Sequence, residues 1–429
     1  MPDYKMELTP EQLDILNGKK GETMAKVMKT LVVYGETFGA TKMVPVTSEK
    51  GHLVTSFGLG VMKPVYDLMD KLIADGAVSK QKFSVDPKPL DKNVPSNFLQ
   101  NFVFNKFMYS VQDAYDAQLA KLGLLDKNAY TCTCYMDEVG NKPKKGEVLS
   151  WAESSAVVYA NSVLGARCNR NSGIIELFGS IVGFVPYFGL LTDEGRKATW
   201  IVEIKTSKKP EAQILGSAIG MKVMEDVPFV KGLDQWIGTE LDGDTCAYLK
   251  DFGAATASNG AVGLYHIENL TPEAVEMGDS LIAENAQIYV IDDAELKRVK
   301  DNYPVMWKDK NAAPKLCFVG CPHLSSAQLA EWTHNVADGL KKNGLKKVSV
   351  PTVFTAAPGV IEKFNKTPEA VVLKNTGVVL SYICPLMYMN NPLSKSMPVI
   401  TNSNKLRTYT TARYYTSDEI LSIITKEVK

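Results

Sequence analysis

The feature that most constrains the fold is the alternation of short β-rich runs with helical segments in the C-terminal third of the chain. Apolar spacing and caps indicate helices over residues 324–342 and 360–364, and Ser325 and Ser326 are candidate N-caps for the first of them. Strands that alternate with helices predict a parallel, doubly wound α/β sheet. The runs that we expect to form strands are residues 288–291, 315–319, 347–353 and 377–383.

The N-terminal part of the chain carries helical signals. Thr9, Pro10 and Gln12 supply an N-cap, a proline at the first helical position and a capping-box partner, so a helix should begin there. Apolar residues then recur at helical spacing, with an interruption around residues 18–21. Residues 151–164 are small or apolar almost without a break, which predicts a helix that is buried on all sides.

Two stretches indicate how these parts are connected. Residues 82–94 contain prolines and show little periodicity, so we expect a surface connection there. We expect an N-terminal helical and α/β region over residues 1–285, followed by a C-terminal α/β domain over residues 286–429.

Composition excludes several classes of protein. The chain has 429 residues with 48 basic and 48 acidic side chains, and such a balance argues against a nucleic-acid partner. Its charged N-terminus lacks the apolar core of a signal peptide, so we expect a cytoplasmic protein. Residues 174–191 are the one stretch long and apolar enough to suggest a membrane span. They contain Glu176 and Pro186, which favour a buried helix running into a turn.

The chain has seven cysteines, an odd number that fits reduced thiols better than a disulfide framework and makes metal ligation possible. Ligands of doubly wound sheets collect outside the carboxyl ends of the strands. Cys321 and Cys384 lie near two such ends, and the run TCTCY offers Cys132 or Cys134 as a third ligand. If that run is extended, its two thiols point the same way about 6.6 Å apart, too far for an unstrained disulfide. Spacing alone leaves a core role open for each cysteine.

Histidines and one arginine are further candidates. His52 lies among glycine and hydroxyl residues, in a loop-like setting where it could meet a substrate. His323 follows Cys321 closely, and a structural role is equally open for both histidines. Arg170, next to Asn169, could clamp a carboxylate or lie at the surface. Of the other two histidines, His266 has core-like neighbours and His334 is expected to be solvated.

Long segments of the chain resemble a known family. They include LTPEQLDILNGKKGETMAKVMKTLVVYGE, MVPVTSEKGH, YTCTCY, LSWAESSAVVYANSVLGARCNR, TASNGAVGLYHIENLTPEA, VGCPHLSSAQL and ITNSNK. On these segments the chain resembles the large subunit of the aconitase X family, over nearly its whole length. The family consists of iron-sulfur dehydratases that act on cis-3-hydroxy-L-proline or on mevalonate 5-phosphate. The resemblance implies an aconitase-like fold of mostly parallel sheets in more than one subdomain, without the small swivelling domain.

The resemblance also implies site residues and a cofactor. The cofactor is an iron-sulfur cluster with one open iron position, which acts as a Lewis acid on the departing hydroxyl and the carboxylate. Three thiolates leave that position open, whereas a fourth would close it. The implied cluster ligands are Cys132, Cys321 and Cys384. The implied catalytic residues are His52, Arg170, Ser154 and Ser155, and the implied substrate-binding residues are Asn169, Arg170, Asn402, Ser403 and Lys405.

Departures from the family pattern leave some assignments open. Cys134 replaces an expected proline and Cys168 an expected threonine, so Cys134, Cys168 or Cys317 could replace a ligand. No segment resembles the swivelling domain, and we expect a separate small subunit to complete the site, with no membrane or nucleic-acid partner. We favour cis-3-hydroxy-L-proline as the substrate. The alternatives are mevalonate 5-phosphate, whose phosphate Lys405 and Arg407 could bind, and a non-catalytic descendant that binds an amino acid or a partner.

Overall fold

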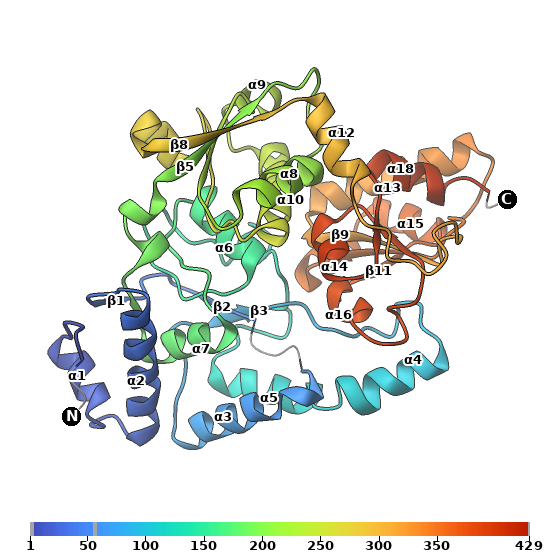
Figure 1. Cartoon of the computed structure of the whole chain (residues 1–429). Coiled ribbons are helices and arrows are strands. Elements are labelled where there is room, and N and C mark those ends of the chain that lie inside the picture. The colour runs from blue at the N-terminus through green and yellow to red at the C-terminus, as the bar shows by residue number, and fades with distance from the viewer. Residues whose placement is uncertain (1–3, 55–57, 428–429) are drawn as a thin grey trace.

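The computed structural model describes residues 4–54 and 58–427, and its C-terminal part is a five-stranded sheet (Figure 1). The strand order is β11-β10-β9-β12-β13, and every neighbouring pair is parallel. This confirms the predicted doubly wound sheet. Its strands are β9 (Leu316–Leu324), β10 (Thr352–Ala356), β11 (Val379–Ser381), β12 (Val399–Thr401) and β13 (Arg413–Tyr414).

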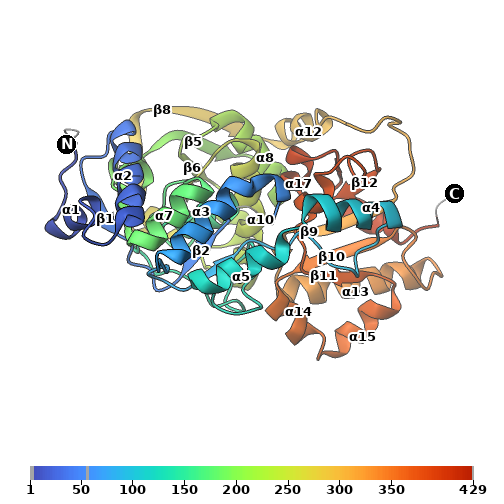
Figure 2. The same ribbon diagram turned by 90° about the horizontal axis from the view of Figure 1, so that it is seen from below.

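Each face of this sheet has its own hydrophobic core, because side chains alternate between the faces along a strand. In β9, Cys317 and Val319 pack with Trp332 on one face, whereas Leu316 and Phe318 belong to the core of the other. Figure 2 shows helices on both sides of the sheet. The first face is covered by α13 (Ser326–Lys342), α14 (Pro358–Phe364), α15 (Pro368–Asn375) and α18 (Ser417–Ile424). The second is covered by α4 (Phe98–Val103), the π-helical turn η2 (Phe104–Met108), α16 (Pro385–Met389) and α17 (Asn404–Tyr409).

A second parallel sheet, in the order β7-β6-β5-β8, lies in the middle of the chain. Two of its helices, α8 and α10, pack unusually closely. A Cβ atom on Gly216 or Gly220 of α8 would come within 2.4 or 2.5 Å of a carbonyl oxygen of α10, so only glycine fits at these positions. The strands are β5 (Ala198–Ile204), β6 (Pro228–Lys231), β7 (His266–Ile267) and β8 (Ile282–Ile291), and the helices are α8 (Ala212–Val223), α9 (Asp234–Ile237), α10 (Gly243–Asn259), α11 (Pro272–Met277) and α12 (Asp293–Asp301).

The helix expected over residues 151–164 is α6 (Ser154–Ser162), which is buried from Ser155 onward in the core of this second sheet. Nearly all of its side chains are small or apolar, so it can be covered on every side. This helix connects the second sheet to the N-terminal part of the chain, and its first turn lies at the cavity described below.

The N-terminal part is mainly helical and encloses a core of its own. The first helix begins where predicted, because Thr9 and Gln12 form the capping box and Pro10 is the first helical residue. Its helices are α1 (Pro10–Leu16), α2 (Glu22–Thr37), α3 (Lys63–Ala74), α5 (Gln112–Leu122) and α7 (Gly173–Val182). Its strands are β1 (Met43–Pro45) and β4 (Phe184–Pro186), which are antiparallel, and β2 (Gly51–Leu53) and β3 (Phe83–Val85), which are parallel. Short 3-10 turns are η1 (Gly60–Met62), η3 (Gly189–Leu191), η4 (Glu194–Arg196) and η5 (Gly278–Leu281).

Three predictions about the organisation need comment. The surface connection expected at residues 82–94 is wrong in its first part, because β3 is a fully buried strand that was too short to show periodicity. Residues 288–291 form a strand, but it belongs to the second sheet rather than the C-terminal one. The boundary expected after residue 285 falls inside β8, whose pairing with β5 continues to Ile291.

The stretch at residues 174–191 is a buried helix that runs into a turn and a short strand, as predicted. None of the helices in the described part of the chain combines the length and the apolar character that a bilayer crossing requires.

Candidate active site

The three cysteines expected to bind a cluster line one cavity of about 410 Å³. Cys321 comes from β9, Cys384 from the start of α16, and Cys132 from a turn nearly 200 residues earlier. The same cavity is lined by the charged side chains of four residues: Asp86, Glu153, Arg170 and Lys405.

Local backbone structure places two of the thiols. Gly320, before Cys321, has φ +106°, and a Cβ atom there would lie 2.4 Å from the Thr355 carbonyl oxygen, so the turn of the chain into the cavity requires glycine. Cys384 is the N-cap residue of α16, and its backbone N–H donates to the Lys88 carbonyl oxygen at 2.8 Å. Both cysteines therefore sit at the end of the sheet where a doubly wound fold collects its ligands.

The third thiol lies at a bend followed by a turn, so the extended conformation considered for the TCTCY run does not occur. The Thr133 backbone N–H donates to Thr131 Oγ1 at 3.1 Å, which folds the chain around Cys132. The two cysteines of the run consequently point to different places. Cys132 faces the cavity, whereas Cys134 is buried in the core close to His52.

The thiols of the cavity are the ligand type that binds iron-sulfur clusters. Within the described residues, no three side chains of His, Cys, Asp or Glu are placed to hold one ion. A single ion needs its thiolates about 2.3 Å from the metal, whereas a cluster is several atoms across and is held by thiolates that stand farther apart. Burial, and then the neighbouring Cys321 thiol, raises the pKa of Cys384 to about 12. Such a thiol ionises readily only when a metal takes the place of its proton.

The other cysteines are in different surroundings. Cys168 and Cys317 are fully buried in hydrophobic cores, and Cys168 hydrogen-bonds the Trp151 backbone at 3.4 Å. Cys246 is half-buried on α10. None of these lines the cavity, so Cys132, Cys321 and Cys384 are the residues that could hold a cluster.

Comparison with known proteins identifies the family. The chain matches the family models "Aconitase X first domain" over residues 5–194 and "Aconitase X second domain" over residues 198–301. It is 31% identical to the phosphomevalonate dehydratase large subunit of Thermococcus kodakarensis, over 83% of this chain and 82% of that one. The chain belongs to the aconitase X family. It is a hydro-lyase of the aconitase superfamily.

Two further relatives of this aconitase X chain are informative. The cis-3-hydroxy-L-proline dehydratase of Hypocrea jecorina is 28% identical and matches 94% of this chain, but only 65% of its own length. The crystal structure of Thermococcus kodakaraensis aconitase X in its holo form superposes with a TM-score of 0.78 at 27% identity, covering 98% of this chain and all of that one. The overall aconitase-like fold predicted from the sequence is thereby confirmed.

On one wall of the aconitase X cavity, a buried ion pair joins the first turn of α6 to α17. Glu153 is the N-cap residue of α6 and accepts hydrogen bonds from the Ala156 backbone at 2.6 Å and the Ser155 hydroxyl at 2.7 Å. Its other oxygen pairs with Lys405, which also contacts Ser155 Oγ at 3.3 Å. Burial would raise the pKa of Glu153, but Lys405 and these hydrogen bonds hold it below its usual range.

His52 was expected in a loop open to substrate, and this is wrong. It lies on β2 and is completely buried, because residues 51–53 pair with β3. Its Nδ1 lies 2.9 Å from Ser84 Oγ and its Nε2 lies 3.2 Å from Asp86 Oδ1. Asp86, rather than His52, reaches the cavity, and burial raises the pKa of this carboxyl to about 6.

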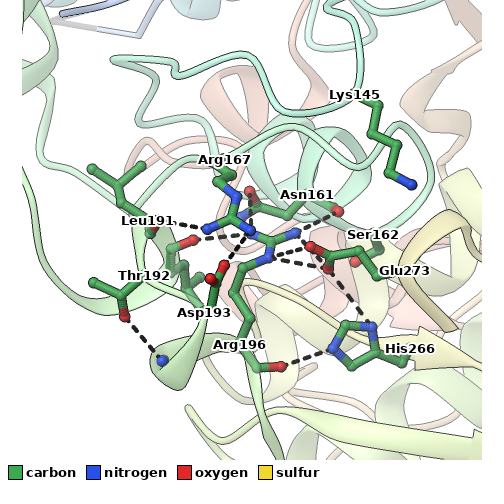
Figure 3. A network of polar contacts seen from close by, with 12 residues as sticks. Lys145, Asn161, Ser162, Arg167, Leu191, Thr192, Asp193, Arg196, His266 and Glu273 are labelled. Carbon is green, nitrogen blue, oxygen red and sulfur yellow. Dashed lines mark hydrogen bonds and ion pairs between the residues drawn. The ribbon is translucent and has the colours of Figure 1, made fainter. Parts of the chain in front are cut away.

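Arg170 lines the cavity as expected, and its side chain lies against Gly263, where a Cβ atom would come within 3.2 Å of Arg170 Cγ. A buried network beyond the cavity fixes this position. Asn161 donates to the Cys168 and Gly263 carbonyl oxygens at 2.8 and 2.7 Å, so it holds both segments that contact Arg170. Arg196 in turn donates to the Asn161 carbonyl oxygen at 3.1 Å (Figure 3).

The same network contains an ion pair. Arg196 donates to both oxygens of Glu273 at 2.7 and 2.8 Å, through Nε and Nη2, and His266 contacts the Arg196 carbonyl oxygen at 2.8 Å (Figure 3). Next to these residues, Arg167 forms an ion pair with Asp193 (Figure 3). His266 is a core residue, as its neighbours in the sequence indicated.

The remaining predicted residues divide between the cavity and its supports. Ser154 lines the cavity. Ser155 does not, and its hydroxyl donates a hydrogen bond to Glu153. Asn169 does not face the cavity: it bonds the backbone of residues 188 and 190 at 3.0 and 2.8 Å. Ser403 is buried as the N-cap of α17, where its hydroxyl accepts from the Leu406 N–H at 3.1 Å, and it lies close to Cys321.

Two residues of the ITNSNKLR segment lie outside the cavity. Asn402 donates to Ser417 Oγ at 3.1 Å and lines a separate, smaller cavity of about 190 Å³ on the other side of Cys321. Arg407 stacks on the Tyr303 ring at 4.2 Å and donates to Asn404. Direct substrate contacts from Asn402, Ser403 and Asn169 therefore have no support in this geometry.

Sequence reasoning missed Asp86, Glu153 and Tyr409, all of which line the cavity. Glu153 had a usable signal, because it is an acidic residue at the start of a helix that is otherwise apolar. Asp86 had a weaker one, directly after a three-residue strand that the sequence did not reveal.

Proposed function

We propose that this chain is the cluster-bearing large subunit of a dehydratase that removes water from cis-3-hydroxy-L-proline. The observation that carries the proposal is the convergence of Cys132, Cys321 and Cys384 on one cavity that also contains Arg170 and Lys405. A cluster held by three thiolates would supply a Lewis-acidic iron for the departing hydroxyl. The free cysteines of the described chain suit a reducing compartment, and we place the reaction in the cytoplasm.

The charges of the cavity favour a zwitterionic substrate. Among the described lining residues, Arg170 and Lys405 are cationic, while Asp86 and Glu153 are acidic. Lys405 is paired with Glu153 but keeps an N–H donor for a ligand, and Arg170 is the cation placed to bind a carboxylate by two parallel hydrogen bonds. Asp86 can then face the ring ammonium or the neighbouring C–H bond. An amino acid with one carboxylate and one ammonium matches this balance.

The chain's own residues suffice to assign the proton transfer. A general base works best when its pKa lies near the operating pH, and Asp86 comes closer to this than Glu153. Asp86 takes the proton from the carbon next to the carboxylate, while His52 and Ser84 hold its orientation. The carbon–oxygen bond then breaks, a carbon–carbon double bond forms, and the hydroxide leaves as water after taking up a proton from solvent. Arg170 and Lys405 stabilise the negative charge that develops on the carboxylate.

A separate small subunit completes the site in this proposal. Support comes from the relatives named as large subunits, of which the one from Methanocaldococcus jannaschii matches 94% of this chain and 95% of its own length. The name of those relatives implies a second chain.

A second candidate substrate is mevalonate 5-phosphate, favoured by the phosphomevalonate dehydratase relatives. Its phosphate carries about 1.5–2 negative charges near neutral pH and its carboxylate one more, and both would enter a cavity whose lysine is already paired. Arg407, the other cation considered for phosphate, is held outside by Tyr303 and Asn404. This substrate therefore requires cationic groups from the small subunit.

The test is an assay of the anaerobically reconstituted chain, with and without the small subunit, on both substrates. We expect dehydration of cis-3-hydroxy-L-proline that depends on the second chain. Turnover of mevalonate 5-phosphate alone would move the assignment to the second candidate. Full activity of the isolated chain would overturn the need for a partner, and failure on both substrates by a cluster-loaded complex would overturn the proposed function.

A further inference from the structure

One buried histidine touches the backbone segments of all three cavity cysteines. His323 lies on β9, two residues after Cys321, and its side chain is 1% exposed. Its Nδ1 lies 3.0 Å from Oγ1 of Thr131, the residue before Cys132. Its Nε2 lies 3.1 Å from the carbonyl oxygen of Ile383, the residue before Cys384. We call these two hydrogen bonds the His323 bridge.

The chemistry of the partners fixes the direction of each hydrogen bond. A carbonyl oxygen can only accept, so Nε2–H donates to Ile383. The neutral ring then has a lone pair on Nδ1, which accepts from the Thr131 hydroxyl. Thr131 Oγ1 in turn accepts from the Thr133 backbone N–H at 3.1 Å. Both ring nitrogens are thus occupied by protein groups, and the imidazole has no free nitrogen with which to bind substrate or metal.

We infer that His323 is a positioning residue that holds the segments of Cys132 and Cys384 against β9 before a cluster binds. The backbone hydrogen bonds that hold these two segments go to another part of the chain: the Thr131 N–H donates to the Val85 carbonyl oxygen at 2.7 Å, and the Cys384 N–H to the Lys88 carbonyl oxygen at 2.8 Å. Without the bridge, each turn can move away from Cys321 independently. Three buried thiols must stand at fixed separations to accept one cluster, so this movement would weaken cluster binding. The inference rests on the proposed function only in naming a cluster as the bound group.

The test uses His323→Phe, which keeps a buried ring and removes both hydrogen bonds. His266→Phe is the matched control, because His266 is equally buried but lies in the second sheet, with its Nε2 on the Arg196 carbonyl oxygen. In the metal-free full-length chain, alkylation by iodoacetamide is followed at each cysteine by peptide mass spectrometry. We expect His323→Phe to raise the alkylation rates of Cys132 and Cys384 by about tenfold and to leave Cys317 unchanged. Iron and sulfide binding should weaken by about tenfold in the same variant.

Rates at Cys132 and Cys384 within about twofold of the control would overturn the inference. If His323→Phe does not fold, the same alkylation measurement is made on Thr131→Val. This variant preserves shape and removes the Nδ1 partner together with the acceptor of the Thr133 N–H. Cys132 should become more reactive while Cys384 does not, and either no rise at Cys132 or an equal rise at both thiols would contradict the bridge. A wild-type chain that binds neither iron nor sulfide would refute the proposed cluster, whereas the alkylation result would still decide the positioning role.

Discussion

Two buried ion pairs, Lys405–Glu153 and Arg196–Glu273, have the same chemistry and different surroundings. Arg196 makes a bidentate contact with Glu273, and its remaining donors bond the Leu190 carbonyl oxygen and Asn161. Its side chain is 1% exposed and no described cavity reaches it. Lys405 has three donors, and among the described residues its hydrogen-bond partners are Glu153 and Ser155; it faces the cavity of the three thiols.

The difference separates a structural role from a functional one. The donors of Arg196 are used up by the protein, so that pair can only hold the segment of Arg170 in place. Lys405 keeps donor capacity for a ligand, and its charge lies close to Cys321 and Cys132. Burial alone therefore does not identify a catalytic charge; unused hydrogen-bonding capacity at a cavity does.

The largest effect on stability should follow from breaking the structural pair. Arg196→Met leaves the Glu273 carboxylate buried without its partner, so we expect a loss of ~3–5 kcal/mol in the free energy of unfolding. Urea denaturation of the wild type and the variant measures it. Lys405→Met is the matched change in the other pair and should cost clearly less, because Glu153 can still be solvated through the cavity. Equal losses of unfolding free energy in Arg196→Met and Lys405→Met would contradict the assignment of a structural role to one pair and a functional role to the other.

The converse effect should be seen in turnover. Lys405→Met removes a positive charge that faces the developing negative charge of the substrate, so kcat should fall by ~10²–10³-fold while the fold is retained. Steady-state kinetics of the complex, with circular dichroism as the folding control, checks this. A kcat within about threefold of the wild type would show that Lys405, like Arg196, has a structural role and does not take part in the reaction.

Arg170 and Arg167 offer a sharper comparison within one segment. Arg170 faces the cavity, whereas Arg167 bonds Asp193 and the Leu191 carbonyl oxygen. Arg170→Lys loses bidentate binding of a carboxylate, so KM should rise by ~10-fold. Arg167→Lys should leave KM nearly unchanged. If both variants behave alike, Arg170 does not bind the substrate directly.

The last effect concerns a buried carboxyl that forms no ion pair with the described residues. Burial raises the pKa of Glu211 from 4.5 to about 7, although Tyr414 donates to it at 2.7 Å. Between these values the folded chain retains a proton that the unfolded chain has lost, so stability falls as the pH rises from about 4.5 to 7. Glu211→Gln keeps the hydrogen-bonding shape and should flatten this part of the profile. The melting temperatures of the wild type and of Glu211→Gln, measured between about pH 4.5 and 7, test this prediction. Melting temperatures that change with pH in the same way in both proteins would contradict the raised pKa of Glu211.

The sequence predicted the parts of this molecule that local pattern controls. The parallel C-terminal sheet, the capping box at Thr9 and the buried helix α6 all follow from spacing and caps. The strand β3 was missed, because three residues are too few to show a period, and with it the position of Asp86. His52 was misplaced for the same reason: its burial depends on pairing with β3, a contact between segments more than 30 residues apart.

The site was predicted in part, and through resemblance more than through spacing. Cys132, Cys321 and Cys384 come from three distant segments, and no local pattern states that they share a cavity. The ion pair between Glu153 and Lys405 joins residues that are 252 positions apart, so the sequence around either residue could not predict it.

The most direct test of the account is iron and acid-labile sulfide analysis of single cysteine variants prepared anaerobically. Cys132→Ala, Cys321→Ala and Cys384→Ala remove the thiols of the cavity, and the matched controls Cys168→Ala and Cys317→Ala remove buried thiols outside it. We expect each of the first three to lose iron and sulfide while both controls retain them. Full retention in any cavity variant, or loss in a control, would contradict the assignment of these three cysteines as the cluster ligands.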